Sequence, residues 1–438
     1  MPSNGTKVHV ITYGCAQNKA DGEIIRGILA EHGFKIVDSE SEADIIVVNT
    51  CGVKVPTEFK VLNKLRKLSS TGKPVIVAGC LPKINLEGII KSIPNFAAIV
   101  GPFSYQRIHE IARRIVEGER GIIDIKSDKM VKVCTPRLRE NKVVGIVPIC
   151  EGCLGSCTYC AVRLARGRLF SFPPDAIVRE VERFVREGCR EIWITAQDTI
   201  AYGADIGTSL PELLSKIVEV PGKFRIRIGM MNPGRLLNYL DEMLEVYQHP
   251  KVYKFIHIPV QSGNDEILRR MNRPYTVDEF RQIVKEIRRK IPEMTIETDV
   301  IVGFPGETEE QFMDTVELVK ELEPDIVNIS RFGPRPNTPA AKMKPQVPGW
   351  KIKERSRLMT KVVKEISYRR NQRWVGWRGE VLVSGIGIKG GVVSRNYTYK
   401  PIVLQLGEEY LGYEFEIRIT RADTFYLDAE VISTIRPL

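Results

Sequence analysis

The sequence predicts an α/β protein in three parts, and three observations support this. Two successive blocks alternate short apolar runs with amphipathic helical patterns, which is typical of parallel sheets wound by helices. A third block consists of short strands separated by glycines, which is typical of a small β-barrel. The 438 residues also exceed one compact core, because a domain usually holds about 100 to 200 residues. We therefore expect a flavodoxin-like doubly wound domain, a partial (β/α)6 TIM-like barrel and a small carboxyl-terminal β-barrel.

The first block, residues 1–118, predicts an open sheet covered by helices on both faces. Its strand candidates are residues 8–13, 44–48, 75–78 and 97–100. Apolar residues recur at helical spacing between these runs, and this order of elements fits a flavodoxin-like fold. Residues 119–142 are charged and irregular, so we interpret them as a linker with one strand candidate at 122–125.

The second block, residues 143–371, predicts an incomplete barrel. Its strand candidates are residues 143–147, 191–195, 224–230, 254–260, 295–302 and 325–331. Helical patterns separate these strands, and no seventh or eighth repeat follows them. Active sites of such barrels lie at the carboxyl ends of the strands.

The third block, residues 372–438, changes to short strands, and a basic segment precedes it. Its strand candidates are residues 379–384, 390–394, 402–406, 413–420 and 426–431. From Lys351 to Arg373 the acidic residues are Glu354 and Glu365 alone, against many bases. Small barrels that carry aromatic side chains often bind nucleic acid, and the net charge of +11 favours a polyanionic partner. A solvated helix face remains the alternative for the basic segment. The candidate RNA-contacting residues are Arg369, Arg370, Arg373, Tyr397, Tyr399 and Lys400.

Three cysteines of the first block share one position relative to the strands. Cys15, Cys51 and Cys80 each follow the end of an apolar run. Ligands of open α/β sheets collect at the carboxyl edge, so the three thiols are expected to converge there. Three buried free cysteines are the alternative.

A second set of cysteines lies in one short loop after the first barrel strand. Cys153, Cys157 and Cys160 form a C-x3-C-x2-C run. Thiolates are the usual ligands of iron-sulfur clusters, and three of them leave one iron of a cubane open. Cys150 offers a fourth thiolate and thus a closed zinc site, although zinc sites usually separate their ligand pairs by roughly a dozen residues or more.

The loop from Cys153 to Cys160 resembles the signature of radical S-adenosylmethionine (SAM) enzymes. Further motifs resemble the methylthiotransferase branch of these enzymes. They are Arg166-Gly167, Gln197-Asp198-Thr199, Tyr202-Gly203, Gln261-Ser262-Gly263 and the Gly-Phe-Pro-Gly-Glu run at 303–307. The three amino-terminal cysteines and the terminal β module, which looks like a TRAM domain, match that branch as well. The resemblance covers essentially the whole chain.

This resemblance implies an enzyme with two 4Fe-4S clusters and SAM. Cys153, Cys157 and Cys160 are expected to hold the cluster that cleaves SAM to a 5'-deoxyadenosyl radical. The auxiliary cluster, on the amino-terminal triad, would present the methylated sulfur that replaces hydrogen on adenine C2. The motifs look most like archaeal and eukaryotic enzymes acting on N6-threonylcarbamoyladenosine (t6A) beside the tRNA anticodon. N6-isopentenyladenosine in tRNA, or an aspartate of a ribosomal protein, are alternative substrates, and a zinc-ribbon RNA-binding protein without catalysis is an alternative of another class.

The resemblance also suggests cofactor contacts and partners. The expected cofactor-binding residues are Tyr159, Gln197, Asp198, Gln261 and Ser262. Besides tRNA, an electron donor protein and a sulfur donor are implied. The absence of an apolar run of about 18 residues and the polar start predict a cytoplasmic protein without membrane attachment. Cys134, Cys150 and Cys189 receive no role.

Overall fold

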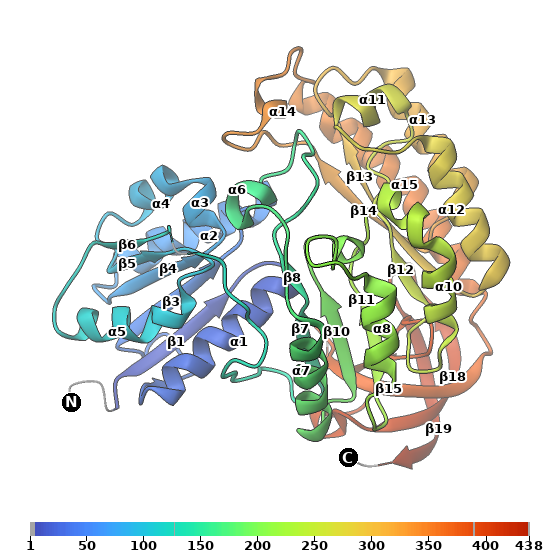
Figure 1. Ribbon diagram of the computed structural model, residues 1–438. Coiled ribbons are helices and arrows are strands. Elements are labelled where there is room, and N and C mark those ends of the chain that lie inside the picture. The colour runs from blue at the N-terminus through green and yellow to red at the C-terminus, as the bar shows by residue number, and fades with distance from the viewer. Residues whose placement is uncertain (1–4, 127, 389, 437–438) are drawn as a thin grey trace.

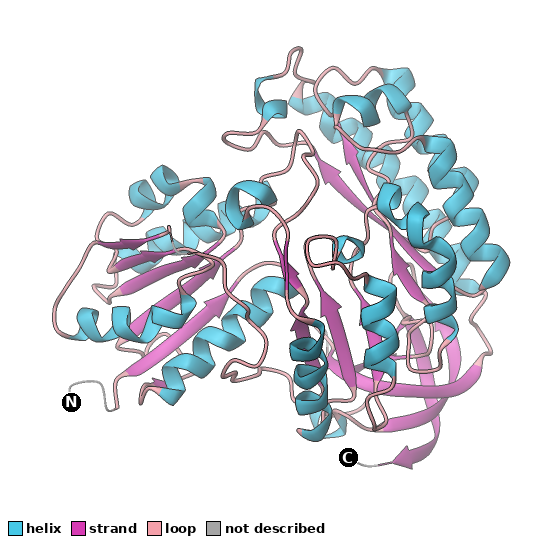
Figure 2. Ribbon diagram, in the orientation of Figure 1, coloured by secondary structure: helices cyan, strands magenta, loops and turns pink. Residues whose placement is uncertain are grey.

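The computed structural model describes residues 5–126, 128–388 and 390–436. An amino-terminal sheet lies on one side of the molecule, the strands of the partial barrel stand beside it, and the carboxyl-terminal barrel lies below (Figure 1). Figure 2 shows helices on the outside of both parallel sheets. The α/β class and the three expected parts are confirmed.

The amino-terminal sheet has six parallel strands in the order β2-β1-β3-β4-β5-β6. The strands are β1 Lys7–Thr12, β2 Lys35–Ile36, β3 Ile45–Thr50, β4 Val75–Gly79, β5 Ala98–Val100 and β6 Ile122–Asp124. β6 is the strand candidate of the expected linker, and it pairs with β5, so the sheet extends past residue 118. The central strands are buried on both faces, which explains why they read as continuous apolar runs.

Helices cover both faces of this sheet and form one core on each. Helices α1 (Ala16–Glu31) and α5 (Ile108–Val116) pack in one core, and α2 (Val55–Ser69) and α4 (Leu86–Ser92) in the other. A one-turn helix α3 (Leu81–Ile84) precedes α4, and a 3-10 turn η1 (Tyr105–Arg107) precedes α5. The result is the doubly wound arrangement that the sequence predicts.

The central domain holds six parallel barrel strands in two hydrogen-bonded groups, β11-β10-β7 and β12-β13-β14. They are β7 Val144–Pro148, β10 Glu191–Thr195, β11 Arg225–Ile228, β12 Phe255–His257, β13 Thr295–Val302 and β14 Ile326–Arg331. The groups meet where Ile226 bridges to Val252, just before β12. A short ribbon, β8 (Cys150–Glu151) with β9 (Phe170–Ser171), extends from β7 towards the amino-terminal sheet (Figure 1).

The helices of the central domain follow from apolar spacing and from capping. They are α6 Val162–Arg166, α7 Pro174–Arg186, α8 Leu210–Val218, α9 Pro233–Leu236, α10 Leu240–Gln248, α11 Asp265–Arg270, α12 Val277–Lys290, α13 Glu309–Leu322 and α14 Pro339–Lys342, with 3-10 turns η2 Thr199–Ala201 and η3 Leu237–Tyr239. Capping boxes start α12, at Thr276 and Glu279, and α13, at Thr308 and Gln311. These caps satisfy amide groups that the first turn leaves free, and so fix where each helix begins.

Helix α15 (Gly349–Gln372) connects the partial barrel to the carboxyl-terminal barrel. The barrel closes in the order β15-β16-β17-β19-β18. Its strands are β15 Arg378–Ile386, β16 Val392–Arg395, β17 Pro401–Leu404, β18 Glu414–Ala422 and β19 Leu427–Arg436, with a 3-10 turn η4 Glu408–Tyr410. In the part of the chain that the structure describes, no helix is long and apolar enough to cross a membrane.

Candidate active site between two cysteine triads

The amino-terminal cysteines lie at the carboxyl edge of the sheet, as predicted. Cys15 precedes α1, Cys51 follows β3, and Cys80 follows β4. Gly14 adopts φ +118°, and a Cβ there would lie 2.7 Å from the Cβ of Cys51. This close approach brings the β1 and β3 loops together. Burial raises the pKa of the Cys80 thiol to about 12; Arg166 lowers it, whereas Cys51 and Cys15 raise it further, so the three groups lie within electrostatic reach.

The second triad lies on the loop between β8 and α6. Cys153, Cys157 and Cys160 are each partly exposed. The Gly155 amide donates to the Cys153 sulfur at 3.2 Å, and a Cβ on Gly155 would lie 3.4 Å from that sulfur and 3.7 Å from the Cys157 sulfur. Gly155 therefore lies between two of the three thiols. Cys150 differs from them, because it is fully buried in the core of the barrel.

The described side chains do not form a site for a single metal ion. Among the described residues, no group of three or more Cys, His, Asp or Glu side chains converges closely enough to hold one metal ion. A 4Fe-4S cubane differs from a single ion because each of its thiolate ligands binds a separate iron.

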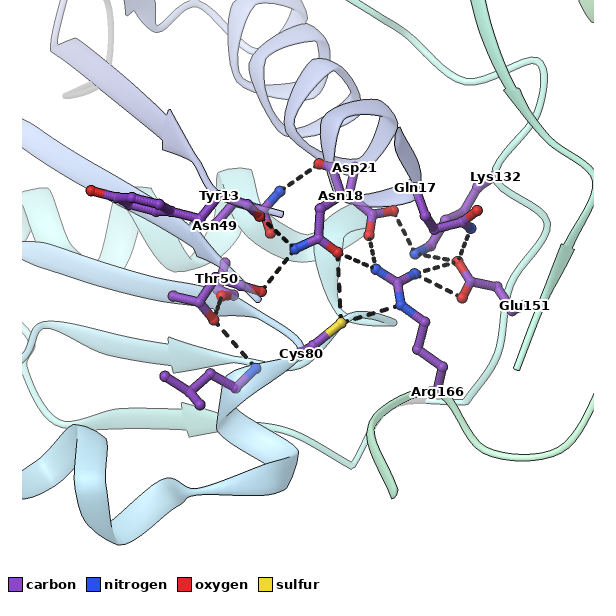
Figure 3. Close-up of polar contacts among 12 residues, drawn as sticks. Tyr13, Gln17, Asn18, Asp21, Asn49, Thr50, Cys80, Lys132, Glu151 and Arg166 are labelled. Carbon is purple, nitrogen blue, oxygen red and sulfur yellow. Dashed lines mark hydrogen bonds and ion pairs between the residues drawn. The ribbon is translucent and has the colours of Figure 1, made fainter. Parts of the chain in front are cut away.

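A buried ionic network joins the two triads, and Arg166 is its centre (Figure 3). Arg166 ends α6, six residues after Cys160, and its Nε donates to the Cys80 sulfur at 3.2 Å. Its Nη2 donates to Asp21 on α1 at 2.6 Å, and its Nη1 donates to Glu151 on β8 at 2.8 Å. Arg166 thus contacts Cys80 of the first triad and lies on the helix that directly follows the second triad in the sequence.

Lys132 completes this network from the expected linker. Its Nζ lies 2.8 Å from the Asp21 carboxylate and 2.7 Å from that of Glu151. Lys132, Arg166, Asp21 and Glu151 are each at most 1% exposed, so two cations balance two anions away from water. Segment 119–142 therefore does more than link the domains, and the sequence alone did not indicate this.

Sequence reasoning also missed a second arginine at the cysteines. Arg273, after α11, donates to the Cys157 sulfur at 3.4 Å and to the Pro259 carbonyl at 3.2 Å. Its position has no motif, because the loop after α11 approaches Cys157 only through the tertiary fold. Cation donors such as this stabilise thiolate over thiol.

A cavity of about 390 Å³ is lined by residues of both domains, and Cys160 is the triad cysteine in its described lining. Residues 53–56, just after Cys51, line one wall, and Tyr159 and Cys160 line another. The carboxyl ends of β13 and β14 and the loop that follows β14 provide the rest. A cavity of this size suits a nucleoside-sized ligand.

Comparisons with known proteins match this arrangement. The model described as Radical SAM superfamily matches residues 147–319, and the one described as Uncharacterized protein family UPF0004 matches residues 7–101. A protein of Pyrococcus horikoshii named probable threonylcarbamoyladenosine tRNA methylthiotransferase is 48% identical over 98% of this chain and 100% of its own length. The chain belongs to the radical SAM methylthiotransferase family. The human threonylcarbamoyladenosine tRNA methylthiotransferase is 36% identical, over 99% of this chain and 76% of its own.

A solved structure supports the fold of this methylthiotransferase. The radical SAM methyltransferase TsrM from Kitasatospora setae aligns with a TM-score of 0.57 at 16% identity, over 77% of each chain. Membership of the radical SAM superfamily implies a 4Fe-4S cluster and SAM. It also sets aside the alternative of a noncatalytic zinc-ribbon protein.

Of the expected cofactor contacts, Asp198 has the geometry that suits SAM best. The carboxylate is 3% exposed, and its Oδ1 accepts from the Asn232 amide at 2.9 Å. Its Oδ2 is buried with no hydrogen-bond partner in the described structure. Burial raises the pKa of Asp198, and its charge raises the pKa of Cys153, so this carboxylate lies beside the second triad. An ammonium group would satisfy the free oxygen.

Of the other four expected cofactor-binding residues, two line the cavity and two do not. Tyr159 and Gln261 line the cavity, and Gln261 does so with a left-handed backbone, φ +71°. Gln197 follows β10 and is partly exposed, one residue before Asp198. Ser262 is fully buried and outside the described cavity lining, and its hydroxyl lies 3.4 Å from the Thr315 hydroxyl on α13, so its cofactor contact stays a prediction.

Three of the six candidate RNA-contacting residues are instead buried between the two barrels. Arg370 and Lys400 both pair with Asp325 at the start of β14, at 3.1 Å and 2.8 Å. Tyr399 donates to Glu191 at 3.2 Å. Their exposure of 2 to 7% excludes a direct RNA contact in this structure. The positions of charged and aromatic residues in the sequence do not reveal that the loop between β16 and β17 turns inward.

The other three candidates remain at the surface. Arg369 and Arg373 are exposed and both pair with Glu323, and Tyr397 packs against Trp374 and Trp377. Neither Cys134 nor Cys189 belongs to a triad: the first donates to the Ala176 carbonyl, and the second is buried beside Arg139.

Proposed function

We propose that this chain methylthiolates C2 of t6A next to the tRNA anticodon, giving 2-methylthio-t6A. The observation that carries the proposal is the cavity lined by Cys160 of the second triad and by the loop that follows Cys51 of the first, in a chain whose relatives are named for this reaction. We also propose that each triad holds a 4Fe-4S cluster. When bound, the cluster of Cys153, Cys157 and Cys160 supplies with SAM a radical for hydrogen abstraction, and the cluster of Cys15, Cys51 and Cys80 supplies the sulfur.

In this scheme the residues of the chain bind the cofactors, orient the reacting groups and exclude water from them. Asp198 would accept a hydrogen bond from the methionine ammonium of SAM through its free Oδ2, and Tyr159 would contact the adenine side of SAM. Arg273 and Arg166 donate to one sulfur of each triad and hold the thiolates in place. The cofactors carry the hard chemistry, while the protein positions the groups and excludes competing reactions.

The test is mass spectrometry of tRNA nucleosides. Incubation of the anaerobically reconstituted protein with SAM, a sulfide source, a reductant and t6A-containing tRNA should convert t6A to a product heavier by one methylthio group. Conversion of isopentenyladenosine but not t6A, or modification of a ribosomal protein alone, would contradict the proposed substrate.

The tRNA is expected to contact an exposed basic stripe on α15. Arg355 and Arg370 of this helix are buried, but Lys353, Arg357, Lys361 and Lys364 are exposed, at spacings of four, four and three, and form no ion pair in the described structure. These spacings place them on one helical face. We call this set the α15 stripe.

Two lysine variants separate RNA contact from domain docking. Lys361→Gln should weaken tRNA binding and reduce the slope of log K against log salt by about one, because one phosphate contact is lost. Lys400→Met should lower the free energy of unfolding by roughly 3 kcal/mol, since Asp325 loses a buried partner, and leave the salt slope unchanged. Fluorescence anisotropy over a salt series and urea unfolding measure the two effects. The opposite pattern would restore Lys400 to the RNA-contacting set.

A further inference from the structure

The wall of the cavity is basic where the two domains meet. Its lining includes Lys54, Arg331 and Arg335, whereas Asp299 is its one acidic residue among those described. The Asp299 carboxylate is already engaged, because its Oδ2 lies 3.0 Å from His257 and its Oδ1 accepts from Asn328 at 2.7 Å. Three bases thus stand against one acidic residue in the described lining, so this wall carries excess positive charge.

Arg335 is the most constrained of these bases. It is 4% exposed, and one nitrogen pairs with Glu58 on α2, outside the cavity lining. Its Nε and Nη2 are buried and have no hydrogen-bond partner in the described structure. A buried donor without a partner is costly, and more so when it is charged, so such a group is most simply explained by a missing acceptor.

Lys54 and Arg331 provide charge that is still accessible. Both side chains are exposed, and the structure gives neither an ion pair with an acidic residue in the described part of the chain. Lys54 lies three residues after Cys51. Gly333, two residues after Arg331, lies close to Val55: a Cβ on Gly333 would be 2.7 Å from a methyl group of Val55. The three bases thus gather where the loop after β14 meets the loop after β3.

We propose that Lys54, Arg331 and Arg335 bind the carboxylate of the threonylcarbamoyl group on the substrate adenosine. This inference rests on the proposed function and deepens it, because it names the residues that select an anionic N6 substituent. Arginine binds carboxylates through two parallel hydrogen bonds, and buried donors reject a ligand that cannot accept them. An isopentenyl group is uncharged and apolar, and it would leave Lys54 and Arg331 without an ion pair in the described structure and two nitrogens of Arg335 without an acceptor.

The test compares anticodon stem-loops that differ only at position N6 of the adenosine. The reconstituted protein, without reductant so that no turnover occurs, is titrated with loops carrying t6A, the methyl ester of t6A, or isopentenyladenosine. Fluorescence anisotropy should show t6A bound at least about tenfold more tightly than the ester, because the ester lacks the charge. Equal affinity for t6A and its ester would overturn the inference.

Variants identify the residues and exclude other anions. Arg331→Gln and Lys54→Gln should weaken binding of the t6A loop about tenfold and leave the ester loop unchanged. Lys361→Gln on the α15 stripe is the control and should weaken both loops equally. If Arg331→Gln weakened binding of both loops equally, Arg331 would bind a backbone phosphate. If it instead weakened binding of SAM, Arg331 would bind the methionine carboxylate. Either result overturns the inference.

Failure of the inference differs from failure of the proposed function. If t6A and its ester are methylthiolated equally well, the function stands and carboxylate recognition does not. If neither is methylthiolated by the active, reconstituted protein, the proposed function fails. Arg335→Gln is a useful third variant only if its urea unfolding midpoint matches that of the wild type, because its pair with Glu58 is buried.

Discussion

Arg166→Met is expected to lower the free energy of unfolding by about 3 to 5 kcal/mol. The substitution keeps the volume of the side chain but removes the guanidinium, and among the described residues it leaves Lys132 as the one ion-pair partner of Asp21 and Glu151. Buried carboxylates without enough counter-charge are strongly destabilising, since neither can regain its water shell. Urea unfolding at neutral pH measures this loss.

The loss should also depend on pH. Burial alone would raise the pKa of the Glu151 carboxyl, but Arg166 and Lys132 bring it down to about 2. Because this pKa is below the value of about 4.3 in an unfolded chain, Glu151 stabilises the fold above that pH and loses its contribution as pH falls towards 2. In Arg166→Met the folded-state pKa is higher, so this carboxyl should contribute little at any pH.

The matched control is Arg168→Met on the same segment. Arg168 is exposed, so its replacement should change the free energy of unfolding by less than about 0.5 kcal/mol. If the two variants were equally stable, the network in Figure 3 would not be what holds the domains together. Limited proteolysis between residues 125 and 142 gives a second measurement, because the Arg166 variant should expose this segment.

Removal of one cysteine from either triad is expected to halve the iron content. Two 4Fe-4S clusters give about eight iron atoms per chain, and Cys157→Ala or Cys80→Ala should leave about four. Both variants should form no detectable 2-methylthio-t6A, for different reasons. Cys157→Ala should lose SAM cleavage, whereas Cys80→Ala should keep it, because only the first variant lacks the cluster that binds SAM.

Iron and sulfide analysis after anaerobic reconstitution checks this prediction, with 5'-deoxyadenosine formation as the second measurement. Cys134→Ala is the control, because Cys134 belongs to neither triad and should retain about eight iron atoms. A wild-type content of about four, or zinc in its place, would contradict the two-cluster proposal.

The sequence predicted some parts of this protein well because their signals are local. The apolar runs and helical spacings gave the three parts of the fold, and even the strand candidate at 122–125 is β6 of the sheet. Cys15, Cys51 and Cys80 could be placed together because parallel strands bring their carboxyl ends to one edge. The C-x3-C-x2-C loop needed no tertiary information.

The network and the cavity had no such signal. Arg166, Arg273 and Arg335 are single bases in a chain rich in them, and only their burial against distant residues distinguishes them. The same reason explains why Arg370 and Lys400 were taken for RNA contacts: an inward-facing base and a surface base look alike in sequence. Their partner, Asp325, lies at least 45 residues away along the chain.

The amino-acid sequence by itself thus determined the three parts, the two cysteine triads and the family resemblance, since periodicity and motif spacing are properties of short segments. The tertiary structure alone decided which bases face a sulfur, a carboxylate or solvent. It also decided that Cys160 of the second triad and the loop after Cys51 of the first line one cavity with a basic wall. These features depend on how the two domains pack. Many weak contacts between segments that are distant in the sequence determine this packing, so no single segment predicts it.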